Sequence, residues 1–137
     1  MSLEALRALS DPSAPYDGVS AYAYTKRAQV ELAARLHAQA LDEGGVIEHH
    51  SAHPGWAYTP GVVSSLPAFT RFTQERLRTP EQGADTCVWL SASSQPLPGA
   101  FWFDREARSP HLLGHRPTPE QREALWRFVR EGAGLLA

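Results

Sequence analysis

The longest regular pattern in the chain is helical. Strong helix formers run through residues 20–41 without glycine or proline, and Ser20 stands where an N-cap is expected. The apolar stripe at helical spacing consists of Ala28, Leu32, Ala33 and Leu36. Gly44-Gly45 is expected to end this helix. Residues 1–19 hold a short helical pattern and then a turn rich in proline, serine and aspartate.

Two short segments bounded by turn residues, residues 46–51 and 100–103, predict strands. The expected order of elements is helix, strand, helix, helix, strand, helix. Strands that alternate with helices indicate an α/β fold with parallel pairing and right-handed crossovers. Because two strands are too few for a stable parallel sheet, the pattern is typical of the last part of a doubly wound domain. We therefore expect residues 1–137 to form one partial domain.

The remaining helices are predicted from local signals. Residues 54–67 hold three prolines and two glycines, so a loop is expected there, and a helix is expected over residues 66–77. Thr79-Pro80-Glu81 and Thr118-Pro119-Glu120 are helix starts, with threonine as N-cap and proline in the first turn.

Composition argues against several classes of protein. Thirteen basic and fifteen acidic residues among 137 give a net charge of −2, so nucleic acid is not an expected partner. No run reaches the ~18 apolar residues of a membrane span, and the N-terminus has no signal-peptide pattern. A single cysteine, Cys87, fits a reducing compartment, so we expect a cytoplasmic protein.

The histidines do not predict a metal site. His49 and His50 are neighbours on an expected strand, so their side chains point to opposite faces. No cysteine or carboxylate completes a recognised zinc spacing with them or with His53. We expect no bound metal.

Tyr22 and Lys26 carry the clearest chemistry, and Lys26 is the only lysine of the chain. Residues four apart lie on one face of a helix, so the phenol and the ammonium can converge on one ligand. A nearby ammonium stabilises a phenolate. Such a pair suits an enzyme that gives a proton to a carbonyl oxygen, or takes one from an alcohol, while hydride moves. The alternative is an exposed lysine beside a tyrosine that packs the helix.

The segment Pro54-Gly55-Trp56-Ala57-Tyr58-Thr59 follows the first expected strand directly. A loop that leaves the carboxyl end of a parallel strand is where an α/β sheet places its ligand. Gly55 allows close approach of the backbone, and the hydroxyl of Thr59 can bond an amide. An ordinary turn between strand and helix is the alternative.

Five blocks, taken in order, resemble the short-chain dehydrogenase/reductase family. They are Ser20–Ala28, Val46–His53, Pro54–Gly61, Glu81–Ser93 and Gly99–Arg105. The resemblance implies the C-terminal part of a Rossmann-type α/β domain, from about Tyr16 to the last helix. Residues 20–42 would be its catalytic helix, and residues 54–78 its cofactor loop and substrate lid.

The resemblance also implies roles for single residues. Tyr22 would be the catalytic acid/base, and Lys26 would bind the nicotinamide ribose and tune Tyr22, so both would contact the cofactor. Pro54 and Gly55 would lie against the nicotinamide, and Thr59 would bond its carboxamide or a phosphate. The cofactor would be NAD or NADP, and the substrate a small carbonyl compound or alcohol.

Two further features of the family concern the lid and the catalytic serine. Residues 60–78 would form a mobile lid, with Phe69 and Phe72 lining its apolar side. The family's serine precedes its tyrosine, and two positions stay open for it: Ser10, twelve residues before Tyr22, or a serine upstream of Met1, which we favour.

The chain departs from the family in its nucleotide-binding half. Its ten glycines form neither G-x-x-x-G-x-G nor G-x-G-x-x-G, and the first five strands of the usual sheet are not expected. Hydride transfer would then need an N-terminal half that these residues do not supply, and the chain alone would be inactive. The expected partner is that complementing half or a second copy of the chain. The alternative function is a non-catalytic interaction module that pairs with a partner chain.

Overall fold

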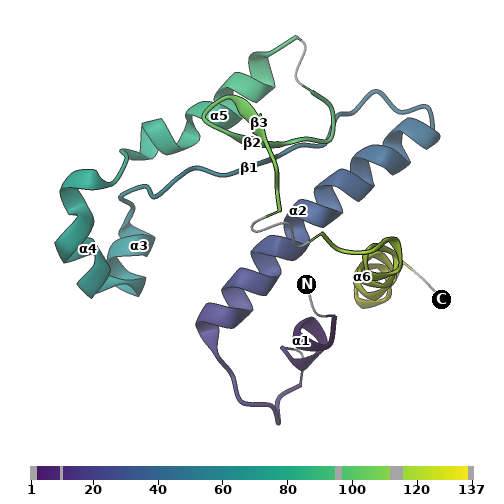
Figure 1. Cartoon of the computed structure of the whole chain (residues 1–137), viewed down its shortest axis with the longest axis horizontal. Coiled ribbons are helices and arrows are strands. Elements are labelled where there is room, and N and C mark those ends of the chain that lie inside the picture. The colour runs from purple at the N-terminus through teal and green to yellow at the C-terminus, as the bar shows by residue number, and fades with distance from the viewer. Residues whose placement is uncertain (1–2, 10, 95–96, 112–115, 136–137) are drawn as a thin grey trace. The chain divides into compact units, whose positions relative to one another are not determined.

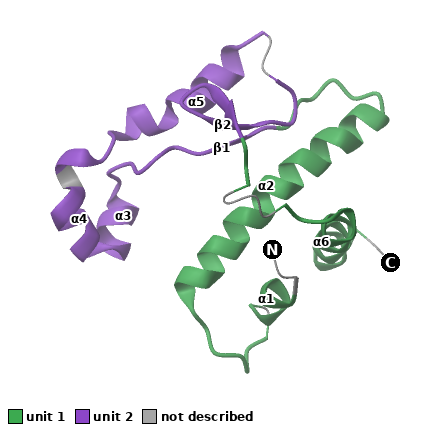
Figure 2. Cartoon of the chain, viewed as in Figure 1, with its two compact units in different colours: residues 1–49, 109–137 green, residues 50–108 purple. Residues whose placement is uncertain are grey.

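The computed structural model describes residues 3–9, 11–94, 97–111 and 116–135 (Figure 1). The chain divides into two compact units, residues 1–49 with 109–137 and residues 50–108 (Figure 2). Each unit is described by itself. Across the described ranges, no helix combines the length and the apolar character needed to cross a bilayer.

In the described part of unit 1, the helices are α1 (Leu3–Ala8), α2 (Gly18–Asp42) and α6 (Pro119–Gly132). Their core centres on one buried residue from each helix, Leu6, Ala28 and Leu125. The partly buried side chains around it are Leu9, Tyr24, Leu32, Phe128 and Val129. The predicted stripe on α2 is thus confirmed at Ala28 and Leu32, whereas Leu36 is 39% exposed.

The N-cap of α2 lies three residues before Ser20, the predicted cap. The cap is Asp17, whose carboxylate accepts hydrogen bonds from the amides of Val19 and Ser20 at 3.2 and 3.1 Å. Hydrogen bonding from Ser20 and Val19 lowers the pKa of Asp17 below its usual value. Asp17 rather than Ser20 is the N-cap because its two carboxylate oxygens accept from two amides of the first turn. At the other end, Gly44 takes a φ of +69° just past the helix, as predicted.

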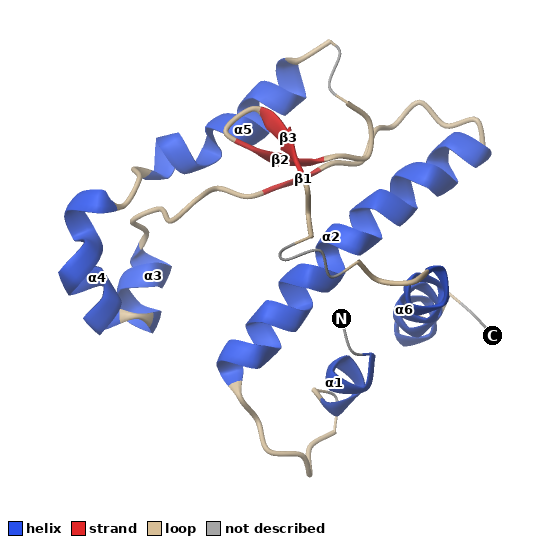
Figure 3. Ribbon diagram, viewed as in Figure 1, coloured by secondary structure: helices blue, strands red, loops and turns tan. Residues whose placement is uncertain are grey.

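A small mixed sheet lies in unit 2 (Figure 3). Strand β1 (Ser51–Ala52) pairs in parallel with β2 (Phe101–Phe103), which pairs antiparallel with β3 (Glu106–Arg108). The expected parallel pairing is present, but it covers only Ser51 and Ala52. Residues 46–50 are not a strand, and Val46 and Ile47 are 94% and 69% exposed. The α/β class is confirmed at this level, and a larger doubly wound sheet stays a prediction.

The turn between β2 and β3 was not predicted. Asp104 and Arg105 have φ values of +53° and +60°, the left-handed pair typical of a two-residue hairpin. Neither residue is glycine, so the usual sequence signal is missing. Contacts with α5 (Pro80–Ala92) hold the turn instead: Arg105 donates from its amide to Thr86 Oγ1 at 3.3 Å and from Nε to Asp85 at 2.8 Å.

The other helices of unit 2 are α3 (Pro60–Ser65), α4 (Pro67–Thr73) and the short 3-10 helix η1 (Gln74–Arg76). Helix α3 corrects the prediction of a loop through residue 67, and it forms because Thr59 caps it and Pro60 opens its first turn. The predicted starts of α5 and α6 are confirmed. Each has a capping box, made by Thr79 with Gln82 and by Thr118 with Gln121.

Candidate active-site residues and their supports

Tyr22 and Lys26 lie together on α2. Lys26 Nζ is 5.8 Å from the centroid of the Tyr22 ring, within range of a cation–π contact. Tyr22 is 67% exposed and Lys26 is also exposed, so both polar ends are accessible to a ligand. Tyr24, on the other side of the helix, packs against the core instead.

A buried carboxylate lies one turn beyond Lys26 on α2. Glu31 has a side chain that is only 5% exposed. Its oxygens accept from Arg27 at 2.5 Å and from Nε of Arg122, on α6, at 3.1 Å. Two cations therefore satisfy a charge that would be costly to bury alone. The cluster could not be predicted from the sequence, because Arg122 lies on a charged helix face that is expected to be exposed to solvent.

His111 completes the cluster from the segment before α6. Its side chain is 10% exposed, and its Nδ1 lies 2.6 Å from an Arg27 nitrogen. Since the guanidinium can only donate, Nδ1 must accept, and His111 is neutral in this arrangement. Burial and the positive charge of Arg27 both lower the pKa of His111. Arg27 also donates to the carbonyl of Pro110, so the segment is fastened to α2 at two points.

The Pro54–Thr59 loop has a backbone conformation that glycine makes possible. Gly55 has a φ of +75°, and its amide donates to His53 Nδ1 at 2.9 Å. A Cβ at Gly55 would lie 2.7 Å from Nε of Arg78, so this side chain lies directly against the loop. Helix α5 also approaches closely at Gly83, where a Cβ would lie 3.0 Å from the Cβ of Ala57.

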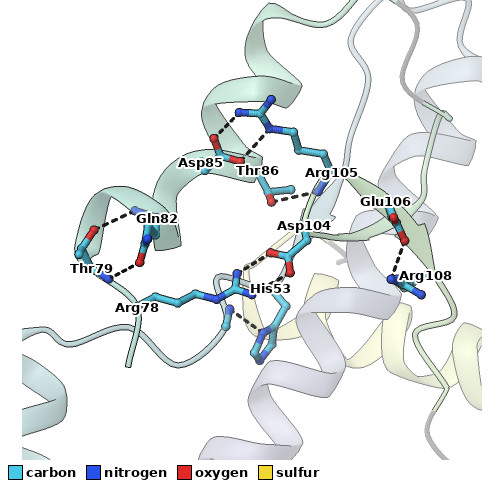
Figure 4. Close-up of polar contacts among 11 residues, drawn as sticks. His53, Arg78, Thr79, Gln82, Asp85, Thr86, Asp104, Arg105, Glu106 and Arg108 are labelled. Atoms are coloured by element: carbon cyan, nitrogen blue, oxygen red, sulfur yellow. Dashed lines mark hydrogen bonds and ion pairs between the residues drawn. The ribbon is translucent and has the colours of Figure 1, made fainter. Parts of the chain in front are cut away.

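Arg78 is the support of this loop that sequence reasoning missed. Its guanidinium makes two hydrogen bonds to Asp104, the longer of them 2.7 Å, at the β2–β3 turn (Figure 4). This pairing raises the pKa of Arg78 and lowers that of Asp104. The neighbouring helix start at Thr79 marks the position in the sequence, but no local signal gives the arginine its partner across 26 residues.

Thr59, which is predicted to bond the cofactor, also stabilises the start of α3. Its Oγ1 accepts from the amide of Val62 at 3.3 Å and so caps α3. The O–H group is not used by that bond and can donate to a carbonyl oxygen of a ligand. Thr59 can therefore cap the helix and bind an amide at the same time.

The two predicted lid residues differ in their surroundings. Phe69 packs on Trp56 with ring centroids 4.8 Å apart, which ties α4 to the loop. Phe72 is 89% exposed. Between them Thr70 is buried, with its hydroxyl donating to the carbonyl of Leu66 at 2.7 Å. An apolar surface is present on this segment, and its role towards a substrate stays a prediction.

The predicted site residues fall into two groups. Tyr22 and Lys26 belong to unit 1, whereas Pro54, Gly55 and Thr59 belong to unit 2. Within each unit the predicted neighbours are together. Ser10, one of the two candidates for the serine, lies outside the described residues.

Taken unit by unit, these groups have the hydrogen-bonding chemistry that a nicotinamide nucleoside requires. An exposed phenol and ammonium suit a ribose and a reacting carbonyl, and the Thr59 O–H suits a carboxamide. Pro54 is exposed, and Gly55 presents backbone without a side chain. No glycine-rich phosphate-binding motif accompanies them in the sequence, so the fit does not extend to the adenosine half.

Two curated proteins are similar to this chain, and both are called dehydrogenase/reductase SDR family member 12. The one from Homo sapiens is 44% identical over 108 residues, and the one from Bos taurus is 38% identical over 125 residues. These alignments cover 76% and 85% of this chain, but 32% and 37% of the relatives. The chain thus spans about a third of the length of the curated relatives that it matches. No family model matches it, and no solved structure matches it significantly.

Proposed function

This chain is a relative of the short-chain dehydrogenase/reductase family, and on that premise we propose that it forms the nicotinamide-facing part of an NAD(P)-dependent oxidoreductase. The reaction is hydride transfer between the nicotinamide and a carbonyl compound or alcohol. The rest of the dinucleotide is bound by a nucleotide-binding part corresponding to the length of the relatives that this chain does not match.

Tyr22 is the acid/base of the proposed reaction. In reduction, its O–H gives a proton to the carbonyl oxygen as hydride reaches the carbonyl carbon, and in oxidation the phenolate takes the proton from the alcohol. The ammonium of Lys26 stabilises that phenolate from the same helix face and donates to the ribose hydroxyls. The exposure and adjacency of this pair, together with the homology, is the observation that carries the proposal.

The loop from Pro54 to Thr59 binds the nicotinamide ring. The backbone at Gly55 would let the ring approach, and the Thr59 hydroxyl would donate to the carboxamide oxygen. When bound, the nicotinamide supplies or accepts the hydride. Phe69 and Phe72 offer the apolar side of the substrate lid.

Titration with a half-cofactor tests this function. Reduced nicotinamide mononucleotide should bind the chain weakly, with a Kd in roughly the millimolar range. The affinity for NADH should be less than about threefold higher, because the sequence has no glycine-rich motif for the rest of the dinucleotide. Lys26→Ala should weaken binding of the mononucleotide, and Tyr16→Phe, which changes an exposed tyrosine elsewhere in unit 1, should not. Micromolar NADH binding would show that the chain holds the whole dinucleotide, and no binding of either compound would refute the nicotinamide site.

A non-catalytic interaction module is the second candidate. Helix α2 exposes apolar side chains at both ends, with Val19 77% and Leu41 60% exposed. A partner, a second copy or the complementing part, could cover them. Size-exclusion chromatography with light scattering distinguishes the cases, since a monomer at all concentrations contradicts self-association.

A further inference from the structure

We propose that Arg78 is the positioning residue of the Pro54–Thr59 loop, and that its pairing with Asp104 sets the affinity of this loop for nicotinamide. The inference rests on the proposed function, because it assigns a support to the same cofactor loop. Arg78 touches neither the proposed substrate nor the reacting atoms, so it acts through the loop.

The main chain of Arg78 fixes the middle of the loop. Its amide donates to the carbonyl of Trp56 at 2.9 Å, and its carbonyl accepts from the amide of Tyr58 at 2.8 Å. These two bonds flank Ala57, which pairs with Arg78 as an isolated parallel bridge. The loop therefore has a strand-like partner just where the chain turns into α5.

The side chain of Arg78 holds the beginning of the same loop. It lies so close to Gly55 that a Cβ there would be 2.9 Å from both Cδ and Cζ. The guanidinium then continues over the ring of Phe103, 4.9 Å from its centroid, and ends on the Asp104 carboxylate. One side chain thus runs from the left-handed glycine to the hairpin.

Asp104 is itself held in place. It sits at the left-handed turn, and the next residue, Arg105, is fastened to Asp85 and Thr86 of α5 (Figure 4). The anchor of Arg78 is therefore fixed by a second arginine–carboxylate pair. Helix α5 also packs against Pro54 and Ala57 through Gly83, so the loop is held from two directions.

The Arg78–Asp104 pair contributes mainly by fixing the orientation of the Arg78 side chain. The two side chains are 30% and 47% exposed, so water screens their attraction. A planar guanidinium bonded by two nitrogens nevertheless has one orientation, which an ammonium does not. A loop already ordered in its binding conformation loses less entropy when a ligand binds. Losing the pair should therefore weaken binding rather than slow the chemistry.

The experiment compares Arg78→Lys and Asp104→Asn with a matched control. The control is Arg108→Lys, which changes another arginine–carboxylate pair of unit 2, with Glu106. The first readout is hydrogen exchange at the amide of Tyr58, measured by NMR on the full chain. The second is the affinity for reduced nicotinamide mononucleotide.

We expect about tenfold faster exchange at Tyr58 and about fivefold weaker binding of the probe in both site variants, and no change in the control. The double variant should be no worse than the worse single one, because the two residues act as a unit. Unchanged exchange at Tyr58 overturns the proposal. So does faster exchange with unchanged affinity, since Arg78 would then be structural only.

The failure of the proposed function gives a different result. In that case the unaltered chain does not bind the mononucleotide, whatever the exchange rates are. Faster exchange in the two site variants would then still support Arg78 as the support of the loop, and equal rates would overturn both proposals.

Discussion

The carboxylate of Glu31 on α2 accepts a hydrogen bond from Arg122 on α6, 91 residues further along the chain, at 3.1 Å. With Arg27 it forms a charge cluster beside the small apolar core of unit 1. Among the residues that the structure describes, Leu125 is the fully buried large side chain of that core, and the charge cluster adds polar contacts between α2 and α6.

Glu31→Ala should therefore destabilise unit 1. Removing the carboxylate takes its hydrogen bonds from Arg27 and Arg122, whose side chains are 24% and 48% exposed. Because water reaches both arginines, we expect a loss of roughly 1.5–3 kcal/mol, typical of hydrogen bonds to a charged group. Urea unfolding followed by circular dichroism measures the loss. Glu123→Ala, an exposed acid on α6, is the control and should change stability by less than ~0.5 kcal/mol. Equal effects of the two changes would contradict the role of the cluster.

Stability should fall when His111 is protonated. Its folded pKa lies below the ordinary 6.5, so the unfolded chain binds the proton more readily. The contribution of neutral His111 is complete above pH 6.5 and is lost as the pH falls from there through the folded pKa. Arg27, Arg116 and Arg122 oppose the added charge, and Glu31 alone favours it.

The check on His111 is the slope of unfolding free energy against pH between 5 and 7.5. His111→Gln, which keeps an acceptor for Arg27, should flatten the slope. An identical slope in this variant would assign the pH dependence to other groups.

Gly55→Ala should disturb the cofactor loop. A Cβ adds strain at a φ of +75° and meets the Arg78 side chain, at a cost of roughly 1–3 kcal/mol. The midpoint temperature of thermal unfolding and the affinity for reduced nicotinamide mononucleotide should both fall. Gly61→Ala is the control, because the nearest atom to its Cβ is 4.0 Å away and helix α3 accepts alanine. A loss of the same size at Gly61 would argue against the close approach of Arg78.

The β2–β3 turn should loosen in acid. Hydrogen bonds from Arg78 and Arg105 hold the pKa values of Asp104 and Asp85 below the ordinary 3.8. Their stabilisation is present above pH 3.8 and is lost as the pH falls through the lowered values. NMR shifts of the Arg105 amide should report this, and Asp104→Asn should show the loosened turn already at pH 7. A turn that does not respond to pH would contradict the pairing.

Tyr22→Phe should separate binding from proton transfer. In an assembly that reduces a carbonyl, losing the phenol should lower kcat by about 10²–10⁴-fold, the range typical of a lost general acid. Affinity for the half-cofactor should change by less than about twofold, because the ring and Lys26 remain. Tyr16→Phe provides the control. Equal kcat values in the two variants would place the acid elsewhere.

The parts of the fold that sequence reasoning predicted are local ones. The capping boxes at Thr79 and Thr118 need only residues three apart, and the Tyr22–Lys26 pair needs only a helix. The N-cap of α2 was misplaced because Asp17 and Ser20 are both good caps, and only the bonds made decide between them.

The missed parts depend on partners distant in sequence. Residues 46–51 form a short segment between turn residues, which predicts a strand, but pairing with β2 begins only at Ser51. The hairpin at Asp104 and the support from Arg78 depend on contacts with α5 and the loop, which no local pattern contains. The burial of Glu31 likewise could not be predicted locally, because it depends on a hydrogen bond from Arg122, 91 residues further along the chain.

Helix α5 carries Gly83 in its first turns, a residue about 1 kcal/mol worse than alanine inside a helix. Because a methyl group there would crowd the one on Ala57, the two positions share room for a single small side chain. Homologues that gain bulk at one of these sites should retain the smallest residue at the other. We therefore expect amino-acid substitutions at positions 57 and 83 to be correlated among related sequences.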